Sequence, residues 1–446
     1  MYHKENRATI AIGLIMSFRM IGLFMLLPVL TLYTQELPGA TPTTIGFALG
    51  IYGLTQACLQ IPFGTLSDYW GRKKVISIGL VLFVAGSIVA ALSTHVWGII
   101  IGRAIQGGGA IGSTTLALLS DVSRDERRSR AMATIGLMIG MSFAISLVLG
   151  PVINAWAHLS GIFWVTAMLG LLGMILLWTV VPSEPTRSGQ HLEGDHWFKV
   201  VNDQALWRLY QGIFSLHAIL TAVFIIIPIM LHHYLKTSVT QTNLLYLGVL
   251  FISFVLMLPL IIYGEKKRAL KRVLIGSVAT LALCMLMLFE VSAVWEIGLI
   301  LCVFFTAFTL LEASLPSLVS KVAPIRRKGM AMGVYSSAQF LGIFVGGSLG
   351  GWSFGRFGTN GVLIFCFVVA ILWLLSVMTM PKPPYLSTQL IKLSQAPSAE
   401  GLKALALKPG VADCMYIAQE QLLYCKIDKQ ILGNYALRDW VEKSNL

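Results

Sequence analysis

Twelve apolar runs, each long enough to cross a lipid bilayer, constrain this chain more than any other feature. A membrane-spanning helix needs roughly 20 mostly apolar residues. Only 12% of the 446 residues are charged, against about a quarter in soluble domains. The chain is therefore predicted to be largely an all-α membrane protein. The predicted spans are 8–34, 43–66, 75–94, 97–120, 131–155, 161–181, 208–231, 242–263, 273–290, 295–319, 330–352 and 361–380.

Lysine and arginine residues favour one side of these spans. The outer loops hold only Lys236 and Arg356 if the N terminus is placed inside. Since basic loops remain cytoplasmic, both termini are predicted to be cytoplasmic, in a bacterial inner membrane. The net charge of +13 is thus assigned to membrane topology and not to nucleic-acid binding. The inner segments hold Lys4, Arg7, Arg72, Lys73, Lys74, Arg124, Arg127, Arg128, Arg130, Arg187, Lys199, Arg208, Lys266, Lys267, Arg268, Lys271, Arg272, Lys321, Arg326, Arg327 and Lys328.

The two halves of the chain resemble each other at an offset of 200 residues. Six plus six spans in the same orientation are typical of transporters. We therefore predict an N-terminal six-helix bundle at 1–181, a cytoplasmic linker at 182–207 and a C-terminal six-helix bundle at 208–380. The matched pairs are Gly64 and Gly264, Arg72 and Arg272, Ser120 and Ser320, Val122 and Val322, Ala131 and Ala331, Met132 and Met332, and Gly150 and Gly350.

A proline-rich linker at 381–386 leads to a polar segment at 387–446. This segment is predicted to form a strand, a helix capped by Ser398, a β-hairpin and a final helix. The order βαββα resembles a small α+β ferredoxin-like domain without its last strand. No CxxC loop is present, and we favour buried thiols over a metal site for Cys414 and Cys425. The final helix is predicted to turn Leu437, Trp440 and Val441 inward.

The stretch "GTLSDYWGRKK" at 64–74 places charges between the second and third spans. A glycine permits a tight turn, and Asp68 can pair with a nearby base. The pattern of Gly64, Asp68, Gly71, Arg72 and Lys73 resembles the loop signature of the major facilitator superfamily.

This resemblance implies a twelve-helix transporter fold with a conformational latch at the loop. It also implies that Asp121, at the end of the fourth span, joins the latch. Tyr69 departs from the signature, which usually has a base there. In the second half, Arg268 is predicted to stand where Asp68 would. The alternative is a loop that only sets membrane topology.

Two further stretches resemble segments of the same superfamily. "GRAIQGGGAIG" matches a motif through Arg103, Gln106 and Gly107, and the resemblance links Arg103 to proton coupling. The alternative is an arginine that snorkels to the membrane surface. Gln106 is also a candidate for the substrate cavity. "LVLGP" keeps Gly150 and Pro151, the core of the motif of drug:proton antiporters, which implies helix packing and antiport.

Glu312 is the one acid placed well inside a predicted span. Burial disfavours its charged form, so it is our candidate proton carrier; the alternative is a packing hydrogen bond. Arg19, which cannot lose its proton, could bind an anionic substrate group or compensate Glu312. His217 can titrate near neutral pH, although a lone helical histidine more often packs. Tyr335 and Gln339, one turn apart, could line the cavity.

No enzyme signature, phosphate-binding loop or metal-ligand spacing is recognisable, and no cofactor is expected. We predict a monomeric secondary transporter that exports a small molecule in exchange for protons, by alternating access. A facilitator or symporter is one alternative. A membrane sensor that signals through its C-terminal domain is another.

Overall fold

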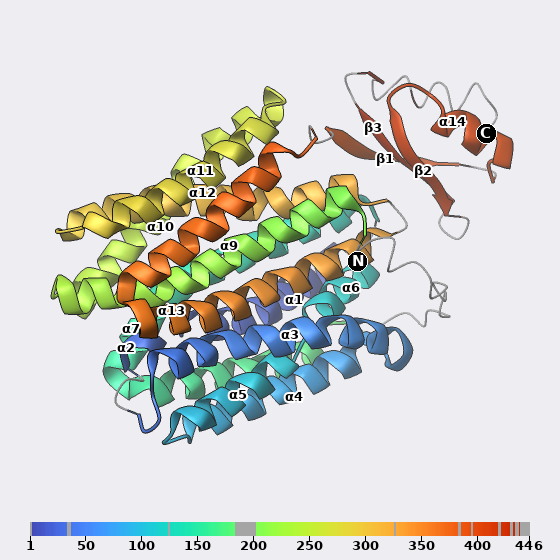
Figure 1. Cartoon of the computed structure of the whole chain (residues 1–446). Coiled ribbons are helices and arrows are strands. Elements are labelled where there is room, and N and C mark those ends of the chain that lie inside the picture. Colours follow the sequence, from blue (N-terminus) through green and yellow to red (C-terminus); the bar gives the residue numbers. More distant parts are fainter. Residues whose placement is uncertain are drawn as a thin grey trace.

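The computed structural model describes a helical bundle with a small α/β domain at one end (Figure 1). It describes residues 2–33, 37–123, 125–182, 202–324, 327–381, 385–393, 396–417, 421–428, 431–432 and 437. Most of the predicted linker at 182–207 and of the last predicted helix, with Trp440 and Val441, lies outside these residues. Helix α1 begins at the end of the bundle that carries the small domain (Figure 1). We call this the domain end, and the opposite end the far end.

The first half contains six crossings, two of them made of two short helices each. A helix break before Pro28 divides the first crossing, because proline cannot donate to the preceding turn. A break at Gly109 divides the fourth crossing. The helices are α1 (Tyr2–Phe24), α2 (Leu27–Tyr33), α3 (Pro42–Trp70), α4 (Arg72–Ala91), α5 (Val96–Gly108), α6 (Gly112–Val122) and α7 (Asp125–Thr179).

The second half repeats this arrangement. Its elements are α9 (Gln204–Ile229), the π-helix η1 (Met230–Tyr234), α10 (Val239–Lys266), α11 (Leu270–Met287), the 3₁₀-helix η2 (Leu288–Glu290), α12 (Val294–Val322) and α13 (Lys328–Met378). Nine helical segments within the described residues are long and apolar enough to span a membrane. Because α7 and α13 are each long enough to cross twice and α5 with α6 adds one crossing, the twelve predicted spans are accounted for.

Local geometry confirms the internal repeat. A single residue with left-handed φ interrupts each of the two longest helices, His158 in α7 (φ 57°) and Gly358 in α13 (φ 62°), and these positions are 200 residues apart. A capping box begins α3 at Thr41 and another begins α10 at Ser238, 197 residues later. The repeat offset therefore varies by three residues along the chain.

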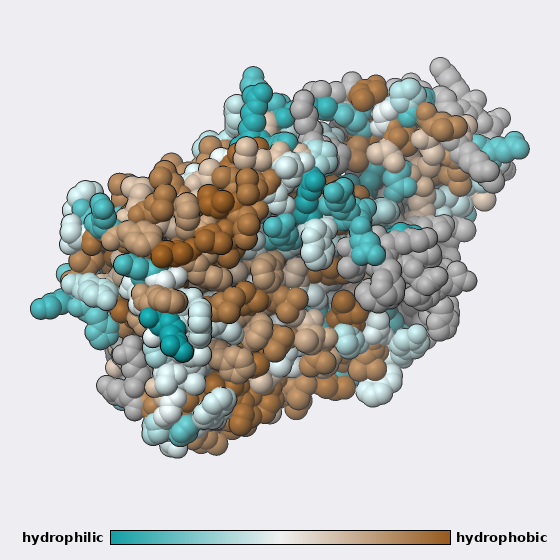
Figure 2. Space-filling model, viewed as in Figure 1, coloured by the Kyte–Doolittle hydropathy of each residue, from teal (hydrophilic) through white to brown (hydrophobic). Residues whose placement is uncertain are grey.

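The outside of the bundle is apolar across the helices, as a lipid-facing surface requires. Figure 2 shows a broad hydrophobic region over the helices, with hydrophilic residues gathered toward the two ends. Large apolar side chains point outward along α10, among them Leu244, Leu247 and Phe251. Such a continuous exposed apolar surface marks contact with a membrane.

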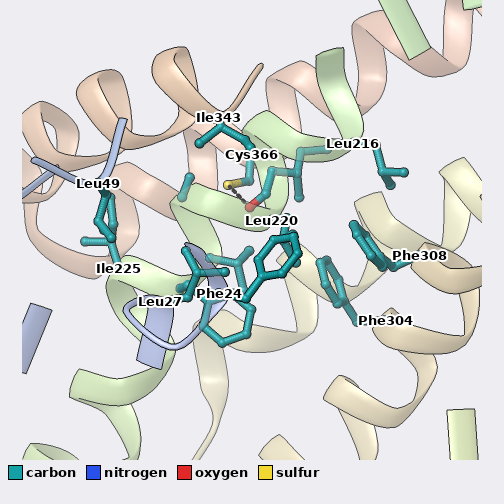
Figure 3. Close-up of a cluster of buried hydrophobic side chains, with 14 of the residues drawn as sticks. Phe24, Leu27, Leu49, Leu216, Leu220, Ile225, Phe304, Phe308, Ile343 and Cys366 are labelled. Carbon is teal, nitrogen blue, oxygen red and sulfur yellow. Dashed lines mark hydrogen bonds between the residues drawn. The ribbon is translucent and has the colours of Figure 1, made fainter. Parts of the chain in front are cut away.

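The two halves are in backbone contact toward the far end, along the seam between α3 and α13. A side-chain carbon added at Gly50 would lie 2.7 Å from the carbonyl oxygen of Phe344, and one added at Gly46 would collide with Gly347. Further along this seam, Ser337 donates a 3.2 Å hydrogen bond to the carbonyl of Ala57. Buried apolar side chains from both halves, including Phe24, Leu27, Leu220 and Ile225, close the region beside it (Figure 3).

The same seam opens toward the domain end. Gly333 lies on the face of α13 that carries Ser337, one turn further toward the domain end, yet a carbon added there would meet no atom within 4 Å. Gly64 lies on the corresponding face of α3 and approaches only Ser113. Within the described residues, the seam between α3 and α13 is therefore tightly packed toward the far end and loosely packed toward the domain end.

The C-terminal domain has the predicted order of strands and helix, β1 (Leu386–Lys392), α14 (Ala399–Ala406), β2 (Val411–Ile417) and β3 (Leu422–Asp428). The sheet is antiparallel with order β1-β3-β2. Ser398 caps α14, because its hydroxyl accepts a 3.0 Å hydrogen bond from the amide of Gly401. Leu405, Leu423, Ile427 and Leu437 form its core.

Candidate functional site

Three side chains from three helices of the second half meet inside the bundle. Gln339 of α13 lies between His217 of α9 and Glu312 of α12. Its amide nitrogen is 2.8 Å from Nε2 of His217 and donates to Oε1 of Glu312 at 3.4 Å. His217 Nε2 is 3.8 Å from Oε2 of Glu312. We call His217, Glu312, Gln339 and the adjacent Tyr335 the titratable cluster.

The hydrogen bonds assign the proton of His217. Its Nδ1 lies 3.3 Å from the carbonyl oxygen of Ile213 and must donate to it. Nε2 is then an acceptor for the Gln339 amide in a neutral imidazole. Neutral histidine also fits its burial, because the surrounding apolar side chains, such as Phe308, cannot solvate a cation.

Glu312 combines partial exposure with incomplete hydrogen bonding. Its side chain keeps 39% of its surface accessible, although the residue lies in the middle of α12. Oε2 has no hydrogen-bond partner within the described part of the chain, and no lysine or arginine there forms an ion pair with Glu312. The hydroxyl of Tyr335 has no such partner either, and it interacts electrostatically with Glu312. The carboxyl group of Glu312 therefore has unused hydrogen-bonding capacity within the described residues.

Two buried arginines lie in the first half, and they share Tyr52. Arg19 of α1 donates through Nη2 to the Tyr52 hydroxyl at 2.9 Å and to Oε1 of Gln56 at 2.8 Å. The guanidinium of Arg103, on α5, lies 4.7 Å from the centre of the Tyr52 ring. Arg103 also donates to the carbonyl oxygens of Ala48 and Leu49, both at 3.4 Å. We call Arg19, Tyr52, Gln56, Arg103 and Gln106 the arginine cluster.

The arginine cluster corrects two expectations. Arg103 is only 1% exposed, so the snorkelling alternative is wrong; its charge stays inside the bundle because backbone carbonyls and an aromatic face solvate it. Arg19 does not compensate Glu312 by a direct ion pair, since its described partners are Tyr52 and Gln56. Its Nε and Nη1 atoms are buried and have no hydrogen-bond partner within the described residues.

Gln106 lies in the helix interface and not on an accessible surface. It accepts a hydrogen bond from Arg103 at 3.2 Å and donates to Ser87 of α4 at 2.7 Å. It is fully buried, so it does not line a cavity in this conformation. Gly107 and Gly150 pack closely against Tyr52 and Met25, respectively, as expected of helix-packing residues. Pro151 follows within α7.

The charged loop between α3 and α4 forms a compact ion-pair cluster at the domain end. The guanidinium of Arg72 lies 2.5 Å from the carboxylate of Asp68 and 3.3 Å from that of Asp121, at the end of α6. It also donates to Ser67 at 2.5 Å. Gly71 has φ 94°, a conformation that side chains rarely adopt. We call Asp68, Arg72 and Asp121 the latch cluster. Gly64 lies one turn before Asp68 in α3.

Lys73 makes a separate attachment beside this cluster. Its ammonium donates to the carbonyl oxygen of Val181, after the end of α7, at 2.7 Å, and lies 5.3 Å from the centre of the Trp178 ring. The loop thus joins the domain ends of four crossings within the first half, those of α3, α4, α6 and the second part of α7.

The second copy of this loop differs from the predicted alignment. The residue with left-handed φ that follows α3 is Gly71, and its counterpart after α10 is Arg268 (φ 50°). Asp68 precedes the first of these by three residues, and Glu265 precedes the second by three. The prediction that Arg268 replaces Asp68 is therefore wrong, because the repeat offset here is 197 and not 200.

The end of α10 forms an ion pair of its own. In the first half, the base Arg72, at the start of α4, binds the acid Asp121 at the end of the fourth crossing. In the second half, the acid Glu265, at the end of α10, binds the base Lys321 at the end of the tenth crossing, at 2.6 Å. Each half therefore has an ion pair at the domain end of its fourth crossing, although the partner comes from the third crossing in the first half and from the second crossing in the second half.

Sequence reasoning missed Tyr52, Gln56 and Gln60, which support Arg19. Gln56 donates to Gln60 at 2.9 Å, so a chain of amides continues from Arg19 along α3. The available signal was a pair of glutamines four residues apart within an apolar span. Polar side chains at that spacing share one helix face.

Cysteine ligation is not a feature of the site. Cys414 and Cys425 are directly opposed on β2 and β3, and both are free thiols. Burial raises the pKa of Cys425 to about 12 and also raises the pKa of Cys414. Within the described residues, no group of three or more histidine, cysteine or acidic side chains could hold a metal ion.

Comparisons with known proteins agree on one family. The family model described as Major Facilitator Superfamily matches residues 12–264 and, a second time, 212–419. The inner membrane transport protein YajR of Escherichia coli (strain K12) is 41% identical over 447 residues, which are 99% of this chain and 98% of YajR. An uncharacterized transporter of Buchnera aphidicola subsp. Baizongia pistaciae (strain Bp) is 34% identical over 378 residues, 83% of this chain and 96% of that protein.

A solved structure supports the fold independently. The crystal structure of a D-xylose-proton symporter superimposes with a TM-score of 0.67, and the match covers 85% of this chain and 97% of that one. Sequence identity is 17%, so the likeness concerns the fold alone.

Proposed function

The chain belongs to the Major Facilitator Superfamily of membrane transporters, and we propose that it exports a small molecule across the inner membrane in exchange for protons. The two six-helix halves would rock about a central substrate site. The protein would function as a monomer. The basic residues of the predicted inner loops support a cytoplasmic domain end. Both termini then lie in the cytoplasm, and the conformation described here faces inward.

The observation that carries the proposal is the titratable cluster. A carboxyl group inside a membrane-spanning helix is costly to keep charged and is commonly functional. Glu312 is partly accessible, has no lysine or arginine partner among the described residues and is joined to His217 through Gln339. In the proposed cycle, Glu312 takes a proton when the far end is open. It releases the proton to the cytoplasm and binds substrate in the charged state.

The latch cluster supports alternating access. Arg72 holds Asp68 and Asp121 within the first half, and Asp68 remains 58% exposed at the separated domain end. We propose that Asp68 contacts the second half when the domain end closes. A carboxylate there is well placed to meet a helix N terminus.

The proposal is tested in two steps. A screen of small molecules for thermal stabilisation of the purified protein identifies a ligand, because binding raises apparent stability. That ligand is then added to proteoliposomes that contain the protein, and its accumulation inside them is followed with and without an imposed pH gradient. An exporter coupled to protons accumulates ligand only with the gradient. Equilibration regardless of gradient would indicate a facilitator, and binding without flux would indicate a sensor.

A second candidate, proton symport of an anionic solute, is favoured by Arg19. Its buried guanidinium has two nitrogen atoms without described partners, and a carboxylate or phosphate group would satisfy them. An anion bound near Glu312 would favour protonation of that carboxyl, so anion and proton would bind together. The affinity for the ligand decides between the two candidates. It should rise with pH for antiport and fall with pH for symport.

A further inference from the structure

Strand β3 of the C-terminal domain contacts the domain end of α12. Lys426 is only 4% exposed. Its ammonium donates to the carbonyl oxygens of Ser320 and Lys321, both at 3.1 Å, and to that of Ala323. An ammonium has three donors, and here each has an acceptor at the C-terminal end of one helix. A cation at this position also interacts favourably with the helix dipole.

A second contact holds the loop between α10 and α11. Arg268 forms a bidentate ion pair with Asp428, the last residue of β3, and one of its two hydrogen bonds is 3.0 Å long. The guanidinium also lies 5.1 Å from the ring centre of Tyr385, whose hydroxyl accepts a 2.9 Å hydrogen bond from the amide of Leu270. The pairing with Asp428 raises the pKa of Arg268. These contacts fix Arg268 in its left-handed conformation, which is unfavourable for a residue with a side chain.

These contacts adjoin an ion pair within the second half. Glu265 and Lys321 join the end of α10 to the end of α12. Lys426 binds the carbonyl oxygen of Lys321, and Asp428 binds Arg268, three residues after Glu265. Every hydrogen bond and ion pair described between the C-terminal domain and the bundle involves the second half. In the first half, the pair of Arg72 and Asp121 is joined by Asp68 at the end of α3 and by no described residue of the C-terminal domain.

We propose that the C-terminal domain is a built-in clamp on the second half, which locks the domain ends of α10, α11 and α12 into one rigid unit. Asp428 and Lys426 bind the helix ends of the second half, as Asp68 binds Arg72 in the first half. The clamp moves with the second half during alternating access, because Lys426 and Asp428 bind it to the ends of α12 and α10. This inference does not rest on proton coupling, so the two can fail separately.

Hydrogen–deuterium exchange of the full-length protein, without substrate, tests the clamp. Asp428→Asn removes the charge of the pair, and Lys426→Met leaves three helix-end carbonyls without their donor. We expect backbone amides at 267–271 and 319–323 to exchange about tenfold faster, since a charged hydrogen bond contributes this much to local stability. Amides at 68–73 should be unchanged. Glu400→Gln, an exposed acid on α14, is the matched control and should change neither region.

A charge exchange keeps the test decisive if Lys426→Met unfolds the domain. Asp428→Arg alone should accelerate exchange at 267–271. Combining it with Arg268→Asp should restore protection to within about threefold of the original, because the pair is rebuilt in reverse. Unaltered exchange in Asp428→Asn, or no recovery in the double variant, would overturn the clamp.

Discussion

Nε2 of His217 lies 3.8 Å from the carboxylate of Glu312, and the two groups reach this position from different helices. Gln339 bridges them from a third. Arg19 of α1, the first helix of its half, is a permanent cation, whereas α9, the first helix of the second half, carries His217 as a neutral histidine. The interior of the first half thus carries fixed positive charge, whereas that of the second half can change its charge with protonation.

The latch cluster predicts the effect of Asp68→Asn. The substitution should lower transport about tenfold or more, because it removes the charge that would hold the domain end closed. The thermal midpoint should change little, since an exposed ion pair contributes at most about 1 kcal/mol. Initial transport rates and melting curves measure the two effects. Transport at the unsubstituted rate would show that this loop only sets topology.

The C-terminal domain predicts the outcome of truncation. Deleting residues 387–446 should leave a folded, membrane-inserted bundle, because the helices satisfy their own backbone groups. The thermal midpoint should fall, since Arg268 and the end of α12 lose their described contacts. Size-exclusion chromatography in detergent and melting curves provide the measurement. A truncated protein that cannot be obtained as a monodisperse species would contradict the predicted boundary.

The close packing of glycines along the seam between α3 and α13 predicts that a substitution there shifts the equilibrium away from far-end closure. In Gly50→Ala the new methyl group would lie 2.7 Å from the carbonyl oxygen of Phe344. This should disfavour far-end closure about tenfold, because overpacking costs on the order of 1–3 kcal/mol. Gly333→Ala gains the same helix propensity but meets no atom within 4 Å, so it is the control. Labelling of a cysteine at position 344 from the far side reports the shift. Equal labelling in both variants would contradict this closure.

The buried thiols predict that the stability of the small C-terminal domain depends on pH. The pKa of Cys425 is raised to about 12, first by burial and then by Cys414 and Asp413. A thiol whose folded pKa exceeds its ordinary value of about 8.5 stabilises the fold fully below pH 8.5, and that stability is lost as pH rises toward 12. Maleimide labelling of Cys425 at pH 8 should therefore be negligible without denaturant. Labelling at the unfolded rate would contradict this.

Much of the architecture could be predicted from local properties of the sequence. The apolar runs predicted every crossing, since lipid forces each span to be long and apolar. Ser398 predicted the cap of α14, and the alternating stretches DCMYIAQ and LLYCKID predicted the hairpin. The charges and glycine of residues 64–74 predicted the pairing of Asp68 with Arg72, and the resemblance to the superfamily implied that Asp121 joins them.

The remaining features depend on tertiary contacts that no local pattern reports. The burial of Arg103 depends on carbonyls of α3 more than 50 residues away. The repeat offset changes between the loop at Arg268 and the kink at Gly358, so one constant offset misassigned Glu265. Lys426 and Asp428 look like ordinary surface charges in a strand, and only the docked domain shows their partners in α12 and beside α11.

Gradient-driven transport by Glu312→Gln tests the central claim most directly. Glutamine keeps the size of the side chain but cannot release a proton at these pH values. With a ligand from the stabilisation screen, exchange across proteoliposomes without a gradient should continue within about threefold of the original rate, whereas accumulation driven by the pH gradient should be abolished. Accumulation at the unsubstituted rate would contradict the account, because Glu312 would then be a packing residue and any coupling would have to reside elsewhere.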